Sequence, residues 1–390
     1  MPVTSLSGGV APRYKASVAG EKIKYPQGRP SASAVDSPVG ASVEQLLGQL
    51  RLGSLSASEV YSYPGRNENW SGITDTGDSV FVKRLKGSPE ESLKRYRRIV
   101  AFERLAKGGV RPFPRPEFLG GDEERRLLVF RMLDDIRSGS ELAAEKEFTE
   151  SMSAQAGRTL AALHRLPFRD EDFPGPDPHP FPPVDDLRSL PLEMYVHATG
   201  AFVQAWGLLQ RDSALLEGLE RLRATEAEVA RVPVHGDLRL DQFLLTDTAF
   251  YVNDWEEFRL GDPARDVGAY VGEWLHRAVL RIPAQETDDA FSAVLTHEEV
   301  VARGSEELTR VLPLVSAFHR GYREGGGPDD DGLVVRATSY AGWHLIDRLI
   351  ASTRESGRLS AIVRAAAGIG RTALLDPRSF VSTVGLGEAS

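Results

Sequence analysis

The spacing of apolar residues changes along the chain and predicts a small strand-rich region followed by a larger helical one. Apolar positions recur at helical intervals over residues 42–50. Short runs of aromatic and β-branched residues then predict strands at 59–63, 70–74 and 79–85. A Thr-Gly-Asp turn at 76–78 indicates that the last two strands form a hairpin.

A helix is expected next, from Pro89 to about Lys107, because proline suits a first helical turn and two glycines follow the last one. Two further strands are expected near 116–119 and 126–132. Strands, a helix and then more strands are typical of a small α+β lobe. We place this lobe at residues 42–133.

The rest of the chain, residues 134–390, has mostly helical patterns and is expected to form a second, mainly helical lobe. Two short apolar runs interrupt these patterns at 243–245 and 250–252. At the opposite end, residues 1–41 are rich in Ser, Gly, Pro and Ala and show little apolar periodicity. A disordered tail is therefore expected there.

Composition narrows the range of function. The chain has no cysteine, which excludes disulfides, thiolate nucleophiles and cysteine-ligated metals and fits a cytoplasmic location. The formal net charge of −9 argues against nucleic-acid binding, which needs a basic face. No stretch approaches the roughly 20 apolar residues of a membrane span. We therefore expect neither nucleic acid nor a membrane as a partner.

The strongest candidate chemistry lies in and just after the segment 232–245. Asp237, in a His-Gly-Asp loop between two apolar runs, can orient an attacking hydroxyl and accept its proton. Gln242 offers an amide oxygen to a hard cation, and Asp254 ends an apolar run where its carboxylate can hold magnesium. Each residue alone is more often a cap, a turn residue or a loop brace. Together, in this order, they are the parts of a phosphoryl-transfer site.

These segments resemble the aminoglycoside phosphotransferase and choline kinase-like branch of the kinase superfamily. The likeness rests on His235-Gly236-Asp237, on the Asn-Asp-Trp-Glu segment 253–256 and on the Gly-Asp-Pro-Ala-Arg-Asp-Val-Gly segment 261–268. It implies a two-lobed, protein-kinase-like α+β fold and an enzyme that uses ATP and Mg²⁺. It also implies that Asp266 braces the catalytic loop. The branch normally has Asn where this chain has Gln242.

The resemblance also assigns residues in the first lobe. Lys83, at the end of a Val-Phe-Val-Lys run, would hold the α- and β-phosphates, and Glu103 on the next helix would pair with it. Backbone groups from Arg131 to Leu133 would bind adenine at the hinge between the lobes. For Lys83 and Glu103, ordinary surface positions are the competing interpretation.

The expected phosphate loop is atypical, because a Gly-x-Gly-x-x-Gly sequence is absent. The segment 64–72 occupies that place. Gly65 allows a tight turn, and Arg66, Asn67 and Asn69 can donate hydrogen bonds to phosphate. A plain polar turn explains the same residues equally well.

Three segments, 65–70, 82–85 and 235–243, are similar to a narrower family, the kinase subunit of class V lanthionine synthetases. This resemblance implies phosphorylation of Ser or Thr in a ribosomally made precursor peptide, with a separate lyase and cyclase as partners. The chain shows no second catalytic motif for elimination. One alternative is a kinase for a small aminoglycoside-like or amino-alcohol hydroxyl. Another is a non-catalytic pseudokinase scaffold, which Gln242 and the missing glycine-rich motif would favour.

Overall fold

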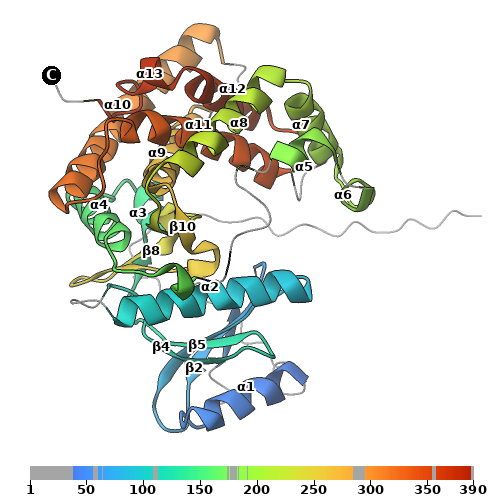
Figure 1. Cartoon of the computed structure of the whole chain (residues 1–390), viewed down its shortest axis with the longest axis vertical. Coiled ribbons are helices and arrows are strands. Elements are labelled where there is room, and N and C mark those ends of the chain that lie inside the picture. The colour runs from blue at the N-terminus through green and yellow to red at the C-terminus, as the bar shows by residue number, and fades with distance from the viewer. Residues whose placement is uncertain are drawn as a thin grey trace, which may run out of the picture.

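The computed structural model describes residues 38–55, 60–63, 65–108, 113–173, 175, 182, 184–190, 192–283, 295–353 and 357–387. Most of the tail expected over 1–41 lies outside these residues. Two lobes are stacked along the long axis of the molecule, a sheet-containing lobe and a larger helical lobe (Figure 1).

A five-stranded antiparallel sheet forms the smaller lobe, in the order β1-β2-β3-β5-β4. Its strands are β1 (Tyr61–Tyr63), β2 (Glu68–Ile73), β3 (Ser79–Arg84), β4 (Phe118–Asp122) and β5 (Leu127–Arg131). The predicted hairpin between β2 and β3 is confirmed, with Ile73 opposite Ser79. Gly77 has a φ of 85° in the connecting turn, a conformation that favours glycine.

Two helices cover opposite faces of this sheet, α1 (Pro38–Gln49) and α2 (Pro89–Lys107) (Figure 1). Leu46 and Leu47 of α1 pack on Val80 and Val82 of β3. Since side chains alternate along a strand, Lys83 lies on the other face of β3, toward α2 and the helical lobe. Ser88 caps α2 and Pro89 occupies its first turn, so the predicted start of this helix is confirmed.

The larger lobe is mainly helical and carries two small sheets. Its helices are α3 (Gly139–Ala144), α4 (Glu150–His164), α5 (Val184–Arg188), α6 (Leu192–Val196), α7 (Gly200–Gln210), α8 (Ser213–Glu228), α9 (Pro263–Arg281), α10 (His297–Glu324), α11 (Leu333–Ser352), α12 (Ala361–Leu375) and α13 (Pro377–Phe380). In the small sheets, β7 (Val232–Val234) pairs with β10 (Arg259–Gly261), and β8 (Phe243–Leu245) lies between β6 (Arg137–Ser138) and β9 (Phe250–Val252).

Close contact between α9 and α11 fixes the wall of the helical lobe that faces the other lobe. Gly268 and Gly272 of α9 make this approach possible. A Cβ atom on Gly268 would lie 2.4 Å from the Ala337 carbonyl oxygen, and one on Gly272 would lie 2.6 Å from the Cβ of His344. Helix α11 is therefore held tightly enough to present its side chains at defined positions.

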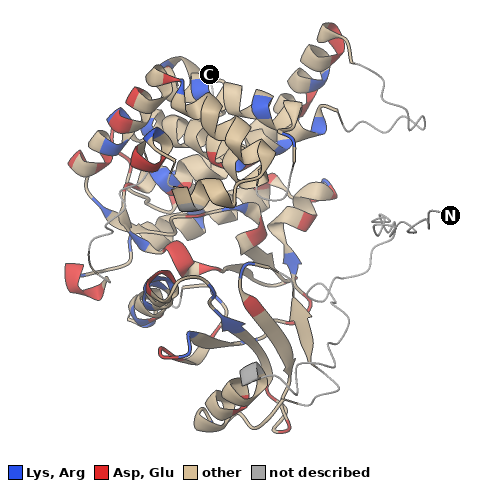
Figure 2. Ribbon diagram, turned by 90° about the vertical axis from the view of Figure 1, so that its right-hand side faces the viewer, with Lys and Arg blue, Asp and Glu red and all other residues tan. Residues whose placement is uncertain are grey.

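The expected fold class, a two-lobed α+β protein of the kinase-like type, is confirmed. Within the part of the chain that the structure describes, no helix combines the length and apolar character that crossing a membrane requires. Acidic and basic residues are interspersed along the ribbon of both lobes (Figure 2).

Candidate active site

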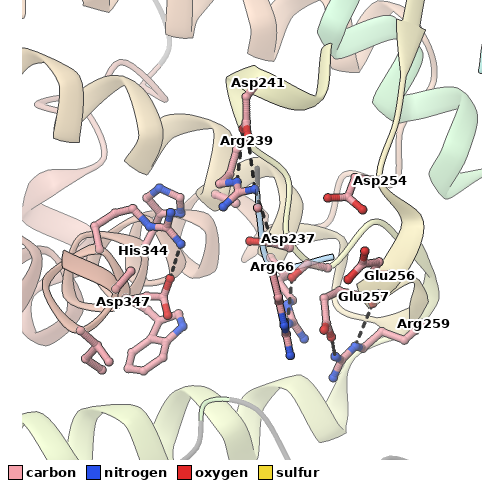
Figure 3. A pocket seen from close by; sticks show the side chains of 18 of the residues that line it. Arg66, Asp237, Arg239, Asp241, Asp254, Glu256, Glu257, Arg259, His344 and Asp347 are labelled. Atoms are coloured by element: carbon pink, nitrogen blue, oxygen red, sulfur yellow. Dashed lines mark hydrogen bonds and ion pairs between the residues drawn. The ribbon is translucent and has the colours of Figure 1, made fainter. Parts of the chain in front are cut away.

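A cavity of about 690 Å³ lies between the two lobes. The smaller lobe contributes residues of the turn before β2 and Lys83 of β3. The larger lobe contributes the loop after β7, the loop after β9 and one face of α11. Asp254 and Glu256 stand on one side of this space, and His344 and Asp347 of α11 stand on the opposite side (Figure 3).

Asp266 braces the loop that carries His235, Gly236 and Asp237, as expected from the sequence. Its carboxylate accepts hydrogen bonds from the backbone nitrogens of His235, at 2.7 Å, and Gly236, at 2.9 Å. His164 Nε2 lies 3.2 Å from the same carboxylate. Burial opposes ionisation of Asp266, but these contacts outweigh it and lower its pKa. His235 braces the same loop through its side chain, because its Nε2 lies 2.9 Å from the Asn253 carbonyl oxygen.

Gly236 sets the direction of the residue that follows it. Its φ is 86°, and a Cβ atom there would lie 2.4 Å from the Glu257 carbonyl oxygen, so only glycine fits. Asp237 then lines the cavity, with its side chain 41% exposed. Burial raises the pKa of Asp237, and the charge of Arg239, whose Nη2 lies 4.0 Å away, partly opposes the rise. A raised pKa suits a carboxylate that accepts a proton.

Asp254 contacts the lysine of the opposite lobe. Lys83 Nζ lies 2.7 Å from Asp254 Oδ1 and 2.5 Å from Glu256 Oε1. Burial works against the charge of Lys83, yet the two carboxylates outweigh it and raise its pKa. Asp254 has φ 68° and ψ 63°, a left-handed conformation that is uncommon for a residue other than glycine and often marks functional sites. The predicted meeting of Lys83, Asp237 and Asp254 in one cavity is therefore present.

The residues present suit a magnesium ion that is held mainly by a nucleotide. Among the described residues, no group of three or more His, Cys, Asp or Glu side chains is placed to hold a metal alone. Magnesium in kinases is bound by one or two carboxylates together with phosphate oxygens and water. Asp254, on the cavity wall, is the residue that fits this role.

Gln242 is not among the residues that line the cavity, although its neighbours Arg239 and Asp241 are. Its side chain is buried, and its Oε1 accepts a hydrogen bond from the Arg239 backbone nitrogen at 3.1 Å. The extra methylene of Gln, relative to Asn, lets the amide fold back onto the loop. To reach a cation, Oε1 would have to leave Arg239. The metal-ligand role of Gln242 thus stays a prediction.

The predicted pairing of Glu103 with Lys83 is wrong. Glu103 Oε2 instead pairs with Arg115 Nε at 2.7 Å. The reason is helical phase. Arg95, Arg98 and Phe102 are spaced along the face of α2 that meets the segment 254–257, and Glu103 lies about 100° from Phe102 around the helix. Lys83 finds its second carboxylate in Glu256, across the cleft.

The turn before β2 contributes Gly65, Arg66 and Asn67 to the cavity, as predicted. Arg66 forms an ion pair with Glu91 in the first turn of α2. Asn67 is only 8% exposed, and its Nδ2 donates to Glu256 Oε1 at 2.6 Å. Thus Gly65 and Arg66 border the cavity, whereas the Asn67 side chain contacts the loop of Asp254. That this turn donates hydrogen bonds to phosphate stays a prediction.

A second cavity of about 190 Å³ adjoins the first and shares Asn69, Lys83 and Asp254 with it. Phe81, Phe130 and Trp255 supply aromatic walls suited to a base. Arg131 lines this cavity, and Leu133 is absent from its lining. The Arg131 backbone nitrogen already donates to the Glu117 carbonyl oxygen at 2.8 Å, so the hinge contact to adenine predicted for Arg131 and Leu133 stays untested.

Sequence reasoning missed Arg95 and the wall of the cavity that α11 forms. Arg95 and Phe102 are seven residues apart, which places them on one helical face, and this spacing was the available signal. For α11, the signal was weaker. His344 and Asp347 lie within a largely apolar helical pattern that gives no hint of which lobe they face.

The family follows from a comparison of the sequence with models of known families. Residues 65–299, more than half of the chain, match the model of the phosphotransferase enzyme family known as APH. The chain belongs to this family. It is accordingly a phosphotransferase with a hydroxyl acceptor. The matched range contains Lys83, Asp237 and Asp254, and it ends before α11.

Two solved structures illustrate how far the fold is shared. A microcompartment-associated aminopropanol kinase is 13% identical, with a TM-score of 0.52, and the match covers 89% of this chain and 99% of that one. Amicoumacin kinase, in complex with AMP-PNP, Ca²⁺ and Ami, is 12% identical, with a TM-score of 0.50 and coverage of 85% and 93%. At these identities the likeness is one of fold. No curated protein matches the chain.

Proposed function

We propose that this phosphotransferase uses ATP to phosphorylate Ser or Thr in a ribosomally made precursor peptide. A partner lyase would then eliminate the phosphate, and a cyclase would add a cysteine thiol, as in lanthipeptide formation. One observation carries the proposal: the three segments that resemble lanthionine synthetase kinases all contribute residues to one cavity. These segments are 65–70, 82–85 and 235–243.

The chemistry assigned to each residue follows from its place. The acceptor hydroxyl oxygen forms a bond to the γ-phosphorus while the bond from that phosphorus to the ADP oxygen breaks. Asp237 orients the hydroxyl and takes its proton. Lys83 contacts the α- and β-phosphates, and Asp254 would hold magnesium, which neutralises phosphate charge when bound. Phe81, Phe130 and Trp255, the aromatic walls of the smaller cavity, would exclude water from the adenine base of ATP.

An exposed apolar surface supports a peptide substrate. It lies next to the wall of the cavity that α11 forms, where we place the acceptor. Leu192, Tyr195 and Val196 of α6 are 75%, 57% and 67% exposed. Thr199, just after α6, donates from Oγ1 to the Thr353 carbonyl oxygen at 2.6 Å, at the end of α11. Helix α11 lines the cavity, so the apolar surface begins near the point where the acceptor wall ends. A peptide has further residues that can extend onto such a surface.

One observation favours the second candidate, a kinase for a small amino alcohol or aminoglycoside. Asp347 on the acceptor wall carries a carboxylate that would suit an ammonium group. The aminopropanol kinase of similar fold points in the same direction. Against this, Arg348 Nη2 lies 2.6 Å from Asp347 Oδ2 and already balances that charge.

A comparison of acceptors in separate assays distinguishes the two candidate functions. ADP formation would be measured with magnesium and ATP, using a candidate precursor peptide, 1-amino-2-propanol and an aminoglycoside in parallel. The proposal expects kcat/KM to be highest for the peptide and to vanish in Asp237→Asn. Turnover of the amino alcohol or aminoglycoside, with none of the peptide, would assign the enzyme to the second candidate.

A further inference from the structure

Arg95 links helix α2 to three other segments around the nucleotide side of the cleft. Its side chain is buried, with the whole residue 1% exposed. Nη1 donates to Glu256 Oε2 at 2.8 Å and to Asn67 Oδ1 at 3.2 Å, and Nη2 donates to the carbonyl oxygen of Lys86. One guanidinium thus joins the turn before β2, the chain just after β3 and the loop that carries Asp254.

Asn67 completes the same arrangement from the side of the turn. Its Nδ2 donates to Glu256 Oε1 at 2.6 Å, and its Oδ1 accepts from the Lys86 backbone nitrogen at 3.2 Å. The Glu256 carboxylate therefore has three partners, namely Lys83, Asn67 and Arg95. Both ends of the Asn67 amide are bonded, so the turn is held in one conformation.

We propose that Arg95, Asn67 and Glu256 form a positioning unit that holds the turn 65–67 ready for the phosphates of the nucleotide. A glycine-rich loop reaches phosphates because its backbone is free to approach them closely. This turn lacks that composition and is fixed instead by side-chain hydrogen bonds. Fixing a loop before its ligand arrives lowers the entropy lost on binding. The unit rests on the part of the proposed function that makes a nucleotide the phosphate donor.

The charges around Glu256 give Arg95 a second effect. Two cations, Lys83 and Arg95, lie against two carboxylates, Asp254 and Glu256. Without Arg95, Lys83 alone would balance both carboxylates and would be held more firmly by the protein. Less of its charge would then be available to phosphate. Arg95 does not line the cavity, so it acts through Lys83 and Asn67 as a positioning residue.

The test compares two buried ion pairs on one helix. Arg95→Gln breaks the unit, and Glu103→Gln breaks the pair with Arg115, which lies outside it. Affinity for AMP-PNP with magnesium would be measured by calorimetry, and the melting temperature of each variant would be recorded. We expect Arg95→Gln to bind the nucleotide about tenfold more weakly or worse, the usual effect of removing a residue that orients a binding group. Glu103→Gln should bind like the wild type.

Two more measurements keep a folding defect apart from a positioning defect. KM for ATP should rise in Arg95→Gln while KM for the acceptor stays unchanged. Asn67→Ala should weaken nucleotide binding to a similar degree, and the double variant should be little worse than either single one.

If Arg95→Gln does not fold, Asn67→Ala and Arg95→Lys take its place. Lysine can pair with Glu256 but cannot also reach Asn67 and the Lys86 carbonyl, so Arg95→Lys should bind nucleotide more weakly than the wild type.

Equal nucleotide affinity in Arg95→Gln and Glu103→Gln would overturn the inference, as would additive effects of the Arg95 and Asn67 substitutions. The same holds for wild-type affinity in both Asn67→Ala and Arg95→Lys. A different result, no binding of AMP-PNP by the wild-type protein, would instead remove the nucleotide donor from the proposed function and this inference with it.

Discussion

Lys83 Nζ lies 2.7 Å from Asp254 Oδ1, so an ion pair joins the sheet-containing lobe to the helical lobe inside the cleft. The two residues are 171 positions apart in the sequence. The lysine side chain is 14% exposed and that of the aspartate 32%, so the pair is partly shielded from water. This contact brings together, before any ligand arrives, the lysine proposed to bind phosphate and the carboxylate proposed to bind magnesium.

Replacing the lysine should therefore affect both stability and activity. Lys83→Met leaves Asp254 without this cation and Glu256 with Arg95 and Asn67 only. We expect a loss of about 3 kcal/mol in the free energy of unfolding, because removing one partner leaves a shielded charge unbalanced. Urea unfolding would measure it. Lys83→Arg keeps the charge and should recover most of the stability but little of the turnover, so equal stability of the two variants would contradict the account.

Asp254 and Asp237 should differ in what their substitution removes. Asp254→Asn should weaken binding of magnesium-bound AMP-PNP, because it replaces the carboxylate that fits the metal. Asp237→Asn should bind that nucleotide normally yet lose turnover, because it lacks the proton acceptor. Nucleotide titration with magnesium, followed by single-turnover kinetics, measures both effects. An equal loss of affinity in the two variants would contradict this division of roles.

The pH dependence of turnover should move when Arg239 is neutralised. Asp237 must be ionised to accept a proton, so activity falls as the pH drops through its pKa. Burial raises that pKa and Arg239 lowers it. Arg239→Gln should therefore raise the pKa further and shift the acidic limb of kcat/KM to higher pH. Arg239→Lys serves as the control and should show a smaller shift. An unchanged limb in Arg239→Gln would mean that another group limits the reaction.

Glu273, under the acceptor wall, should make the protein sensitive to acid. Burial opposes its ionisation, but His344 and Arg277 outweigh this and lower the pKa of Glu273 to about 2. A lowered pKa in the folded state stabilises the protein above the ordinary glutamate pKa of about 4.5. That stability is lost as the pH falls from there toward 2. In Glu273→Gln, the fall in the free energy of unfolding between pH 5 and pH 3 should be smaller by on the order of 1 kcal/mol. An unchanged slope would assign the acid sensitivity elsewhere.

Much of the active site was accessible from the sequence because its residues lie in short, ordered segments. Asp237 directly follows a glycine, and Asp254 comes two residues after the end of β9, so local pattern was enough to mark both. The hairpin before Lys83 was also local, since its turn residues are adjacent in the chain.

The contacts that the sequence did not yield depend on helix rotation and on long-range packing. The position of Glu103 along α2 is compatible with a pairing to Lys83. The direction of its side chain, however, is set by the helix face that carries Phe102, which stacks on Trp255 of the other lobe. The partners that Lys83 has in the structure, Asp254 and Glu256, both lie in the other lobe. A periodic pattern gives the orientation of a helix relative to its own core and does not identify which distant loop meets it.

The central claim, that this chain phosphorylates a peptide and leaves elimination to a partner, is tested most directly by the mass of the product made by this protein alone. With ATP, magnesium and a precursor peptide, the peptide should gain about 80 daltons for each phosphoryl group transferred. It should show no species lighter by a water, about 18 daltons, because elimination needs a further base and stabilisation of the developing charge. Adding the lyase should convert the heavier species into the lighter one. Dehydrated peptide without the lyase, or no mass gain on any precursor peptide while an amino-sugar hydroxyl is phosphorylated, would contradict the account.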